Sequence, residues 1–190
     1  TAVMLEAARK AGVFPFIFAS SSSVYGRSAR LPFREDDPAS DPVSTYAATK
    51  RAGELLCAAH HALYATPILA LRLFTVCGPR QRPDMAIHKF AHAIAEGRVI
   101  PFYGDGSSRR DYTFVSDIVD GMEKALSWKR GFEIVNLGGA HTITLSGLIR
   151  LLELRIGRKA RLKRLPDQEG DVPATYADIR KARRLLGFAP

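Results

Sequence analysis

A tyrosine and a lysine, Tyr46 and Lys50, stand four residues apart in the stretch "YAATK". If this stretch is helical, both side chains lie on one face, because residues four apart in an α-helix are neighbours. A phenol ionises at about pH 10 and is a weak base at neutral pH, but an ammonium beside it favours the phenolate. The pair is therefore a candidate for general base catalysis, although a Tyr and a Lys also share a helix face by chance.

Four hydroxyl side chains follow an apolar run. The segment "SSSSVYG", Ser20 to Gly26, comes directly after residues 13–19. Strands buried on both faces read as short apolar runs, and ligands of parallel α/β sheets gather just beyond the carboxyl ends of such strands. The serines either belong to a binding site or form a polar turn, in which Ser is also common. The loop over residues 27–43 is long enough to bring the serines and Tyr46 together.

Strand and helix patterns alternate along the chain, which predicts an α/β fold with a mostly parallel sheet and crossover helices. The acidic residues Glu35, Asp36 and Asp37 in the proline-containing loop are expected to cap and to be solvated. The last third is shorter and more irregular, which suggests a small substrate lobe. Strands are predicted at residues 16–19, 67–76, 99–103 and 132–139, and helices at 5–12, 44–63, 85–97, 116–128 and 144–157.

Composition indicates an ordinary globular protein. The 190 residues are 46% hydrophobic and 25% charged, enough for one good core. The two cysteines, Cys57 and Cys77, have no metal-ligand spacing, which favours a reduced, cytoplasmic protein. His88 and His92 stand four apart without a neighbouring Glu or a third ligand, so no metal is expected. No signal peptide and no apolar run of the roughly 20 residues of a membrane span are visible, so no membrane partner is expected.

The net charge of +9 raises the question of a nucleic-acid partner. The densest basic cluster is "RIGRKARLKR", Arg155 to Arg164. It contains no aromatic side chains on which bases could stack, and no nucleic-acid-binding module surrounds it. We interpret it as a solvated face and expect no nucleic acid as a partner.

The order of these motifs resembles the extended short-chain dehydrogenase/reductases, the family of the NAD-dependent nucleotide-sugar epimerases and dehydratases. Ser21 lies 25 residues before Tyr46, and Tyr-x-x-x-Lys follows. Within the family, Phe-Thr followed by Gly-Pro and Arg-Pro-Asp-Met-Ala most resembles the UDP-glucuronate 4-epimerase branch. The further matching blocks are "LRLFTVCGPRQRPDMA" (71–86), "RRDYTFVSDIVDG" (109–121) and "QEGDVPATYAD" (168–178).

The resemblance implies the C-terminal part of a Rossmann-like, doubly wound parallel sheet plus a small α/β substrate-binding lobe. Residues 1–80 would form the second half of the NAD-binding domain, and residues 81–190 mainly the lobe, with residues around 110–140 returning to the Rossmann domain. The glycine-rich turn that holds the NAD pyrophosphate is absent from the 190 residues, so we expect an N-terminal NAD-binding portion upstream. The full-length form would be a homodimer.

The resemblance also implies a reaction, the NAD-dependent epimerisation of a UDP-sugar at C4. UDP-glucuronate would become UDP-galacturonate through a 4-keto intermediate. Tyr46 would take the proton from the sugar 4-hydroxyl, and Ser21 would hydrogen-bond the same hydroxyl. Lys50 would bind the nicotinamide ribose and favour ionisation of the Tyr46 phenol. Phe74 would meet the nicotinamide end of NAD.

The substrate contacts implied by the resemblance divide into those for the sugar and those for the nucleotide. Thr75, at the position of an Asn in most epimerases, would hold the sugar carboxylate together with hydroxyls of the serine run. Neutral donors suit a carboxylate held without a salt bridge, and arginines suit a diphosphate. The carboxylate site would comprise Ser21, Ser22, Ser23 and Thr75; Arg82 and Arg110 would bind the diphosphate, Asp171 a ribose hydroxyl, and Phe102 and Tyr103 the uracil.

Other functions differ from this one at identifiable positions. A 4,6-dehydratase of this fold would carry Asp-Glu where this chain has Ser22 and Ser23, and a UDP-glucuronate decarboxylase would have Glu at Ser23. Leu73 and Cys77 depart from the aromatic residues usual in the family. The alternatives are therefore a UDP-glucose 4-epimerase or another nucleotide-sugar epimerase/dehydratase, and a catalytically silent fragment that lacks the glycine-rich cofactor turn.

Overall fold

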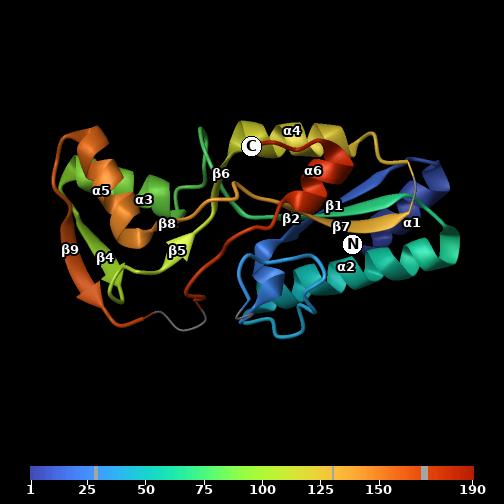
Figure 1. Cartoon of the computed structure of the whole chain (residues 1–190), viewed down its shortest axis with the longest axis horizontal. Helices are drawn as coiled ribbons and strands as arrows, with labels where there is room; N and C mark the ends of the chain where they lie inside the picture. The colour runs from blue at the N-terminus through green and yellow to red at the C-terminus, as the bar shows by residue number, and fades with distance from the viewer. Residues whose placement is uncertain (28–29, 130, 168–170) are drawn as a thin grey trace.

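Three parallel strands form the largest sheet of the computed structural model, which describes residues 1–27, 30–129, 131–167 and 171–190. The strands β1 (Phe16–Ser21), β2 (Ile68–Leu73) and β7 (Phe132–Leu137) lie side by side in that order (Figure 1). Because all three run in the same direction, their carboxyl ends meet at one edge of the sheet. This confirms the predicted parallel α/β fold.

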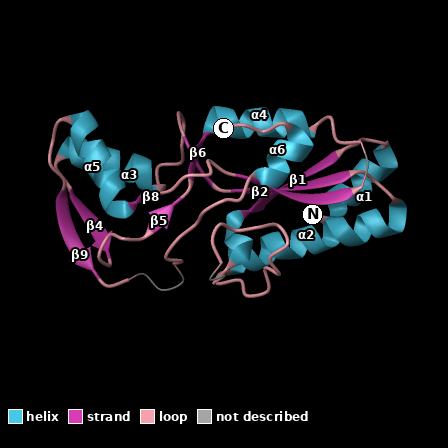
Figure 2. Cartoon of the chain, viewed as in Figure 1, coloured by secondary structure: helices cyan, strands magenta, loops and turns pink. Residues whose placement is uncertain are grey.

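Helices cover both faces of this sheet (Figure 2). On one face, α1 (Ala2–Ala11) and α2 (Thr45–Tyr64) pack so that Leu5, Cys57 and Ile68 form a buried cluster. On the other face lie α4 (Val115–Ala125) and α6 (Arg180–Leu186), which contribute buried side chains to the main core. None of the helices in the described part of the chain has the length and apolar character needed to cross a membrane.

The helix α2 begins at a cap and lies close against β1. The Ser44 hydroxyl accepts a hydrogen bond from the Ala47 main-chain N–H, as expected for the Ser/Thr signal at this position. In the middle of α2, a methyl group added at Gly53 would come within 2.3 Å of the Phe18 ring on β1. The absence of a side chain at Gly53 therefore lets α2 approach the strand that ends in the serine run.

A second, smaller core lies beside the first, at the other end of the molecule in Figure 1. The helices α3 (Ala86–Glu96) and α5 (Leu145–Ile156) pack against each other there. They lie with a two-stranded parallel sheet of β4 (Val99–Tyr103) and β9 (Arg161–Leu165). The strand β9 comes from the basic segment that we expected to be only a solvated face: its side chains are mainly exposed, but its backbone pairs with β4.

Short strands join the two cores. The apolar stretch predicted as one strand, residues 67–76, is divided: β2 ends at Leu73, and β3 (Thr75–Cys77) pairs with β6 (Tyr112–Phe114) instead. The break lies at Phe74, whose N–H still bonds to the Leu137 oxygen of β7. A further pair, β5 (Arg109–Arg110) with β8 (Ile143–Thr144), is antiparallel and lies on the side of the smaller core.

The C-terminal segment also returns to the main sheet, which our proposed domain boundaries do not include. The helix α6 packs on β7, and Ala182 and Phe188 are buried in the main core. Ahead of this helix, Ala177 forms a β-bridge with Phe33 of the long loop. This loop is less solvated than predicted, because the Glu35 carboxylate accepts the Asn136 N–H at the outer edge of β7. Burial raises the pKa of Glu35.

Candidate active site

A cleft of about 660 Å³ opens at the carboxyl ends of β1 and β2. Most of the residues expected to act on the sugar line it, although they come from separate parts of the chain. The parallel sheet explains this convergence, because the loops that leave its carboxyl edge start close together. The residues of this cleft that the sequence singled out are Ser21, Ser22, Ser23, Tyr46, Lys50, Phe74, Thr75 and Arg82.

Lys50 joins α2 to β1. Its Nζ donates a hydrogen bond to the Ala19 main-chain oxygen over 2.8 Å and lies 5.6 Å from the centre of the Tyr46 ring. The Tyr46 side chain, one turn earlier in α2, is 53% exposed at the cleft. The i, i+4 spacing therefore places an ammonium beside a phenol that remains accessible to a ligand.

The serine run divides into structural and cleft-facing members. The Ser20 side chain is buried, and its hydroxyl donates to Glu54 over 2.6 Å. Ser21 ends β1, and its Oγ caps the short 3-10 helix η1 (Ser22–Tyr25) by accepting the Ser23 N–H. The Ser21 and Ser23 hydroxyl oxygens are 3.1 Å apart, within hydrogen-bond distance. The serine run was expected to be either a polar turn or part of a binding site. In the structure its residues form a turn and also line the cleft.

Phe74 lies at the back of the cleft, and Arg82 lies at its mouth. The Phe74 ring is only 3% exposed and packs with Tyr25 and Phe33, at 6.4 Å between ring centres in each case. It therefore forms part of the back wall. The Arg82 side chain is 74% exposed at the mouth, where its guanidinium pairs with Asp84 over 3.3 Å. The same guanidinium also contacts the Met85 sulfur at 3.4 Å.

A second cavity, of about 340 Å³, lies against the smaller core. Arg110 and Asp171 meet there, with Arg110 Nη2 donating to the Asp171 carboxylate, and Tyr103 lines the same space. Thr75 and Met85 line both this cavity and the cleft, so the two spaces adjoin. The three residues of the "QEGDVPATYAD" block before Asp171, 168–170, lie outside the described residues.

Phe102 is separated from this cavity. Its side chain is 3% exposed in the smaller core, and Arg164 stacks over its ring at 5.4 Å. Successive side chains of a strand point to opposite faces, so its neighbours Pro101 and Tyr103 line the cavity instead. Of the two aromatic residues expected at the uracil, the structure brings only Tyr103 to the cavity.

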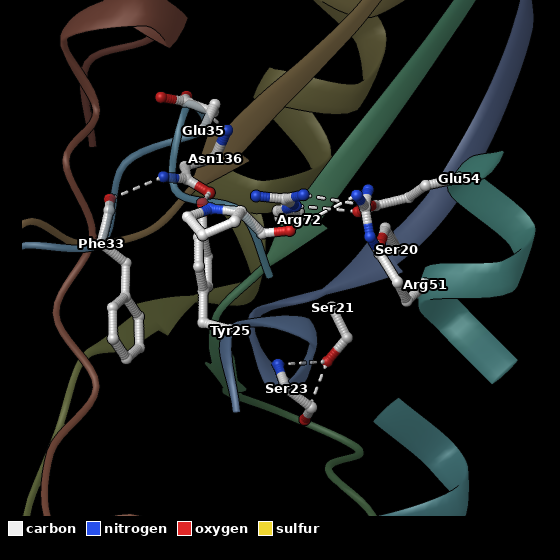
Figure 3. A network of polar contacts seen from close by, with 11 residues as sticks. Ser20, Ser21, Ser23, Tyr25, Phe33, Glu35, Arg51, Glu54, Arg72 and Asn136 are labelled. Carbon is white, nitrogen blue, oxygen red and sulfur yellow. Dashed lines mark hydrogen bonds and ion pairs between the residues drawn. The ribbon is translucent and has the colours of Figure 1, made fainter. Parts of the chain in front are cut away.

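Sequence reasoning missed a buried ion pair behind the cleft, formed by Glu54 and Arg72 (Figure 3). Both side chains are about 1% exposed, and Arg72 donates two hydrogen bonds to the Glu54 carboxylate. Burial is the largest single influence and acts to raise the pKa of Glu54, but the charge and hydrogen bonds of Arg72, together with the hydrogen bonds from Ser20 and Arg51, outweigh it and hold this pKa below its usual range. Two signals point to the pair: Glu54 continues the spacing of Tyr46 and Lys50, and Arg72 is a charge within an apolar strand.

A second missed residue, Asp111, holds the junction between the two cores. Its buried carboxylate accepts the main-chain N–H groups of Gly139, Ala140 and Ala177. Its main-chain oxygen accepts the Thr75 N–H, so Asp111 helps to place Thr75 between the cleft and the cavity. Burial raises the pKa of Asp111, and the backbone N–H groups oppose that shift.

Known proteins resemble this chain over its whole length. An uncharacterised protein from Methanocaldococcus jannaschii is 44% identical over 98% of this chain and 57% of its own length. A UDP-glucuronate 4-epimerase from Thermodesulfobacterium geofontis is 42% identical over 98% of this chain and 58% of its own length. The solved UDP-glucuronic acid 4-epimerase from Bacillus cereus, in complex with UDP-glucuronic acid and NAD, superimposes with a TM-score of 0.91 at 36% identity, covering 100% of this chain and 60% of that one.

The chain therefore spans somewhat less than two thirds of the length of these relatives. Residues 1–138 match the model of the NAD dependent epimerase/dehydratase family, a range that includes the serine run, the Tyr46 helix and the Arg110 strand. The resemblance seen in the motifs is thus confirmed across most of the chain. The protein belongs to the NAD-dependent epimerase/dehydratase family.

Proposed function

We propose that this chain carries the catalytic and sugar-binding residues of an NAD-dependent nucleotide-sugar 4-epimerase that converts UDP-glucuronate to UDP-galacturonate. One observation carries the proposal: Ser21, Tyr46 and Lys50 converge in one cleft, which adjoins the cavity of Arg110 and Asp171. The UDP-glucuronate 4-epimerases among its relatives support the same conclusion. The geometry suits a nucleotide sugar whose sugar lies in the cleft and whose nucleotide lies in the cavity.

The donors present in the cleft fit the nicotinamide end of NAD. An ammonium has three N–H donors, and Lys50 gives one to the Ala19 oxygen, which leaves two for the hydroxyls of a ribose. Tyr46, Lys50 and Phe74 are the residues that would hold this end. NAD, when bound, supplies a reversible acceptor for the C4 hydride. The 190 residues contain no glycine-rich turn for the pyrophosphate, so none of them is assigned to that part of NAD.

The proton chemistry is assigned to three side chains. The Tyr46 phenolate takes the proton of the sugar 4-hydroxyl and later returns it. The Lys50 ammonium lies 5.6 Å from the centre of the Tyr46 ring, beside the side chain that exchanges the proton. Ser21 bonds the same sugar hydroxyl from the end of β1, a rigid element, and so orients the C–O bond.

Neutral hydroxyls in the cleft suit the carboxylate of the sugar. Ser22, Ser23 and Thr75 line the same space, and hydroxyls can donate to a carboxylate without an ion pair. In the adjoining cavity, Arg110 supplies a guanidinium fork for the diphosphate, while Asp171 accepts from a ribose hydroxyl and Tyr103 offers a ring to the uracil. Arg82, at the cleft mouth, supplies a second cation for the diphosphate. Phe102 has no contact role in this proposal because it is buried in the smaller core.

The test is a product assay with the polypeptide expressed from its complete reading frame. UDP-glucuronate is incubated with the protein and NAD, and the nucleotide sugars are separated by anion exchange and identified by proton NMR. UDP-galacturonate is the expected product. Loss of the carboxylate would indicate a decarboxylase, and turnover of UDP-glucose in preference to UDP-glucuronate would indicate the alternative 4-epimerase. No turnover of either sugar would support the silent interpretation and contradict the proposal.

A further inference from the structure

A row of polar side chains crosses the whole main sheet one residue before its strands end. Ser20 on β1 lies opposite Arg72 on β2, and Arg72 lies opposite Asn136 on β7. All three are buried, with exposures of 3%, 1% and 0%. Such positions in a parallel sheet are ordinarily apolar. The next residue of β1 is Ser21, so the row lies directly behind the proposed site.

Glu54 connects this row to the helix that carries Tyr46 and Lys50. Its Oε1 accepts from Ser20 Oγ at 2.6 Å and from Arg72 Nε at 2.8 Å. Its Oε2 accepts from Arg72 Nη2 at 2.9 Å and from Arg51 Nη1 at 3.0 Å. Figure 3 shows these contacts meeting at one carboxylate. One side chain of α2 thus bonds to both β1 and β2.

The Arg72 guanidinium is also contacted on the side away from Glu54. Its guanidinium stacks over the Tyr25 ring at 4.6 Å, and the Tyr25 hydroxyl donates to Asn136 Oδ1 at 2.7 Å. The Asn136 amide in turn donates to the main-chain oxygens of Phe33 and Asp178. Because the guanidinium is planar and contacted from two sides, it has little freedom to follow a movement of Glu54.

Sequence spacing makes these contacts relevant to the site. Glu54 follows Lys50 by four residues and Tyr46 by eight, on the same face of α2, while Ser20 and Ala19 directly precede Ser21. The Lys50 bond to Ala19 and the Glu54 bond to Ser20 therefore join α2 to consecutive residues of β1. The close approach of Gly53 to the Phe18 ring is apolar and has no directional preference.

Net stability gives a weak reason for such a pair. Desolvation of two buried charges offsets most of their attraction, and well-packed apolar residues of similar volume are often equally stable. A forked pair does, however, fix distance and direction more narrowly than apolar contact does. The value of Glu54 and Arg72 therefore lies in the arrangement that they impose on α2, β1 and β2.

We propose that Glu54 and Arg72 are positioning residues that hold α2 in register with the ends of β1 and β2, so that Lys50 and Tyr46 stay aligned with Ser21. This inference rests on the proposed function for its effect on turnover. Its geometric content, the placement of Lys50 against β1, is independent of the reaction.

The test replaces both charges at once, in the variant Glu54→Met/Arg72→Met. We expect it to fold with a melting temperature close to that of the wild type, because neither charge is left buried alone. The kcat on UDP-glucuronate should fall about tenfold or more, since small misplacements of reacting groups are costly, while KM stays within about threefold. The rate at which acetic anhydride labels Lys50, followed by mass spectrometry, should rise several-fold relative to Lys124.

Arg51→Met is the matched control. Arg51 also bonds to Glu54, but it lies on α2 itself and contacts neither β1 nor β2 through that bond. We expect its kcat and the Lys50 labelling rate to match those of the wild type. If Glu54 acted only through its charge, Arg51→Met would show the same loss of kcat and the same rise in Lys50 labelling as the double variant. That result would contradict the proposal.

Ser20→Ala provides a second variant if the double variant fails to fold. It keeps the ion pair and removes only the hydrogen bond from β1, so a smaller loss of kcat and a smaller rise in Lys50 labelling are expected. Unchanged Lys50 labelling in the folded double variant, or in Ser20→Ala if the double variant is unfolded, would overturn the proposal. A wild-type protein that turns over no nucleotide sugar would defeat the proposed function alone, because Lys50 labelling would still test the positioning.

Discussion

The Lys50 ammonium is bound to the Ala19 main-chain oxygen at 2.8 Å, two residues before the end of the strand that carries Ser21. Through this bond, a side chain of α2 is held at the carboxyl end of β1. The Tyr46 ring, whose centre lies 5.6 Å from the same Nζ, is thereby placed over the cleft. The catalytic role proposed for Tyr46 depends on this bond between Lys50 and Ala19.

Tyr46→Phe should lower kcat on UDP-glucuronate by a factor on the order of a hundred or more, as loss of a general base does. Because the Tyr46 side chain is 53% exposed, thermal unfolding should change little. Steady-state kinetics with a melting curve on the same sample provides the measurement. Near-normal turnover would exclude Tyr46 from the proton transfer.

Thr75→Val should impair UDP-glucuronate more than UDP-glucose. The change keeps the shape of the side chain and removes its hydroxyl, which leaves only the carboxylate of the sugar acid short of a donor, at roughly 1 to 3 kcal/mol in kcat/KM. The two sugars are compared on the same variant. Equal losses on both would mean that Thr75 does not recognise the carboxylate.

Arg110→Met should weaken binding of UDP roughly ten- to hundredfold, since a charge-assisted hydrogen bond contributes about 1.5 to 3 kcal/mol. Isothermal titration with UDP measures this directly. Arg109→Met is the matched control, because Arg109 is the preceding residue of β5 but does not line the cavity. If the two substitutions weakened UDP binding equally, Arg110 would contribute only through the net positive charge of the protein and not through a direct contact with UDP.

The Glu54–Arg72 pair should make the thermal stability of the protein depend on pH. The pKa of Glu54 is lower in the folded protein than its usual value, so the stabilisation from its ionised form is complete above the usual carboxyl range and is lost as pH falls through the folded value. The melting temperature of the wild type, relative to Glu54→Met/Arg72→Met, should therefore decline between about pH 6 and pH 3. Other buried carboxyls, such as Asp111, are common to both proteins. A difference that stays constant with pH would contradict this.

The 190-residue polypeptide expressed by itself should associate and fail to bind NAD at micromolar concentration. Within the described residues β1 pairs only with β2, which leaves the other edge of β1 without a strand partner, and unpaired strand edges promote association. Sedimentation velocity and NAD titration test both points, with the product of the complete reading frame as the comparison. A monomer that binds NAD and turns over UDP-glucuronate would be the contrary result.

Local patterns in the sequence were sufficient for the parallel α/β architecture, for the Tyr46 and Lys50 pair and for the serine run. The other candidate residues of the cleft, Phe74, Thr75 and Arg82, came from the resemblance to the family. The Tyr46 and Lys50 spacing, the Ser44 cap and the apolar run before the serines are features of short segments. Their consequences for structure are therefore local, since helix faces and strand ends follow from residues within a few positions of each other.

Other features depended on tertiary contacts between distant segments. The division of the predicted strand at Phe74, the pairing of the basic segment as β9 and the burial of Phe102 result from the partners that each segment meets across the fold. The Glu54 contacts with Ser20 and Arg72 likewise join residues separated by 34 and 18 positions. The sequence determined which residues could do chemistry, whereas only the tertiary structure decided which of them meet, because side-chain contacts across a fold depend on how whole elements pack.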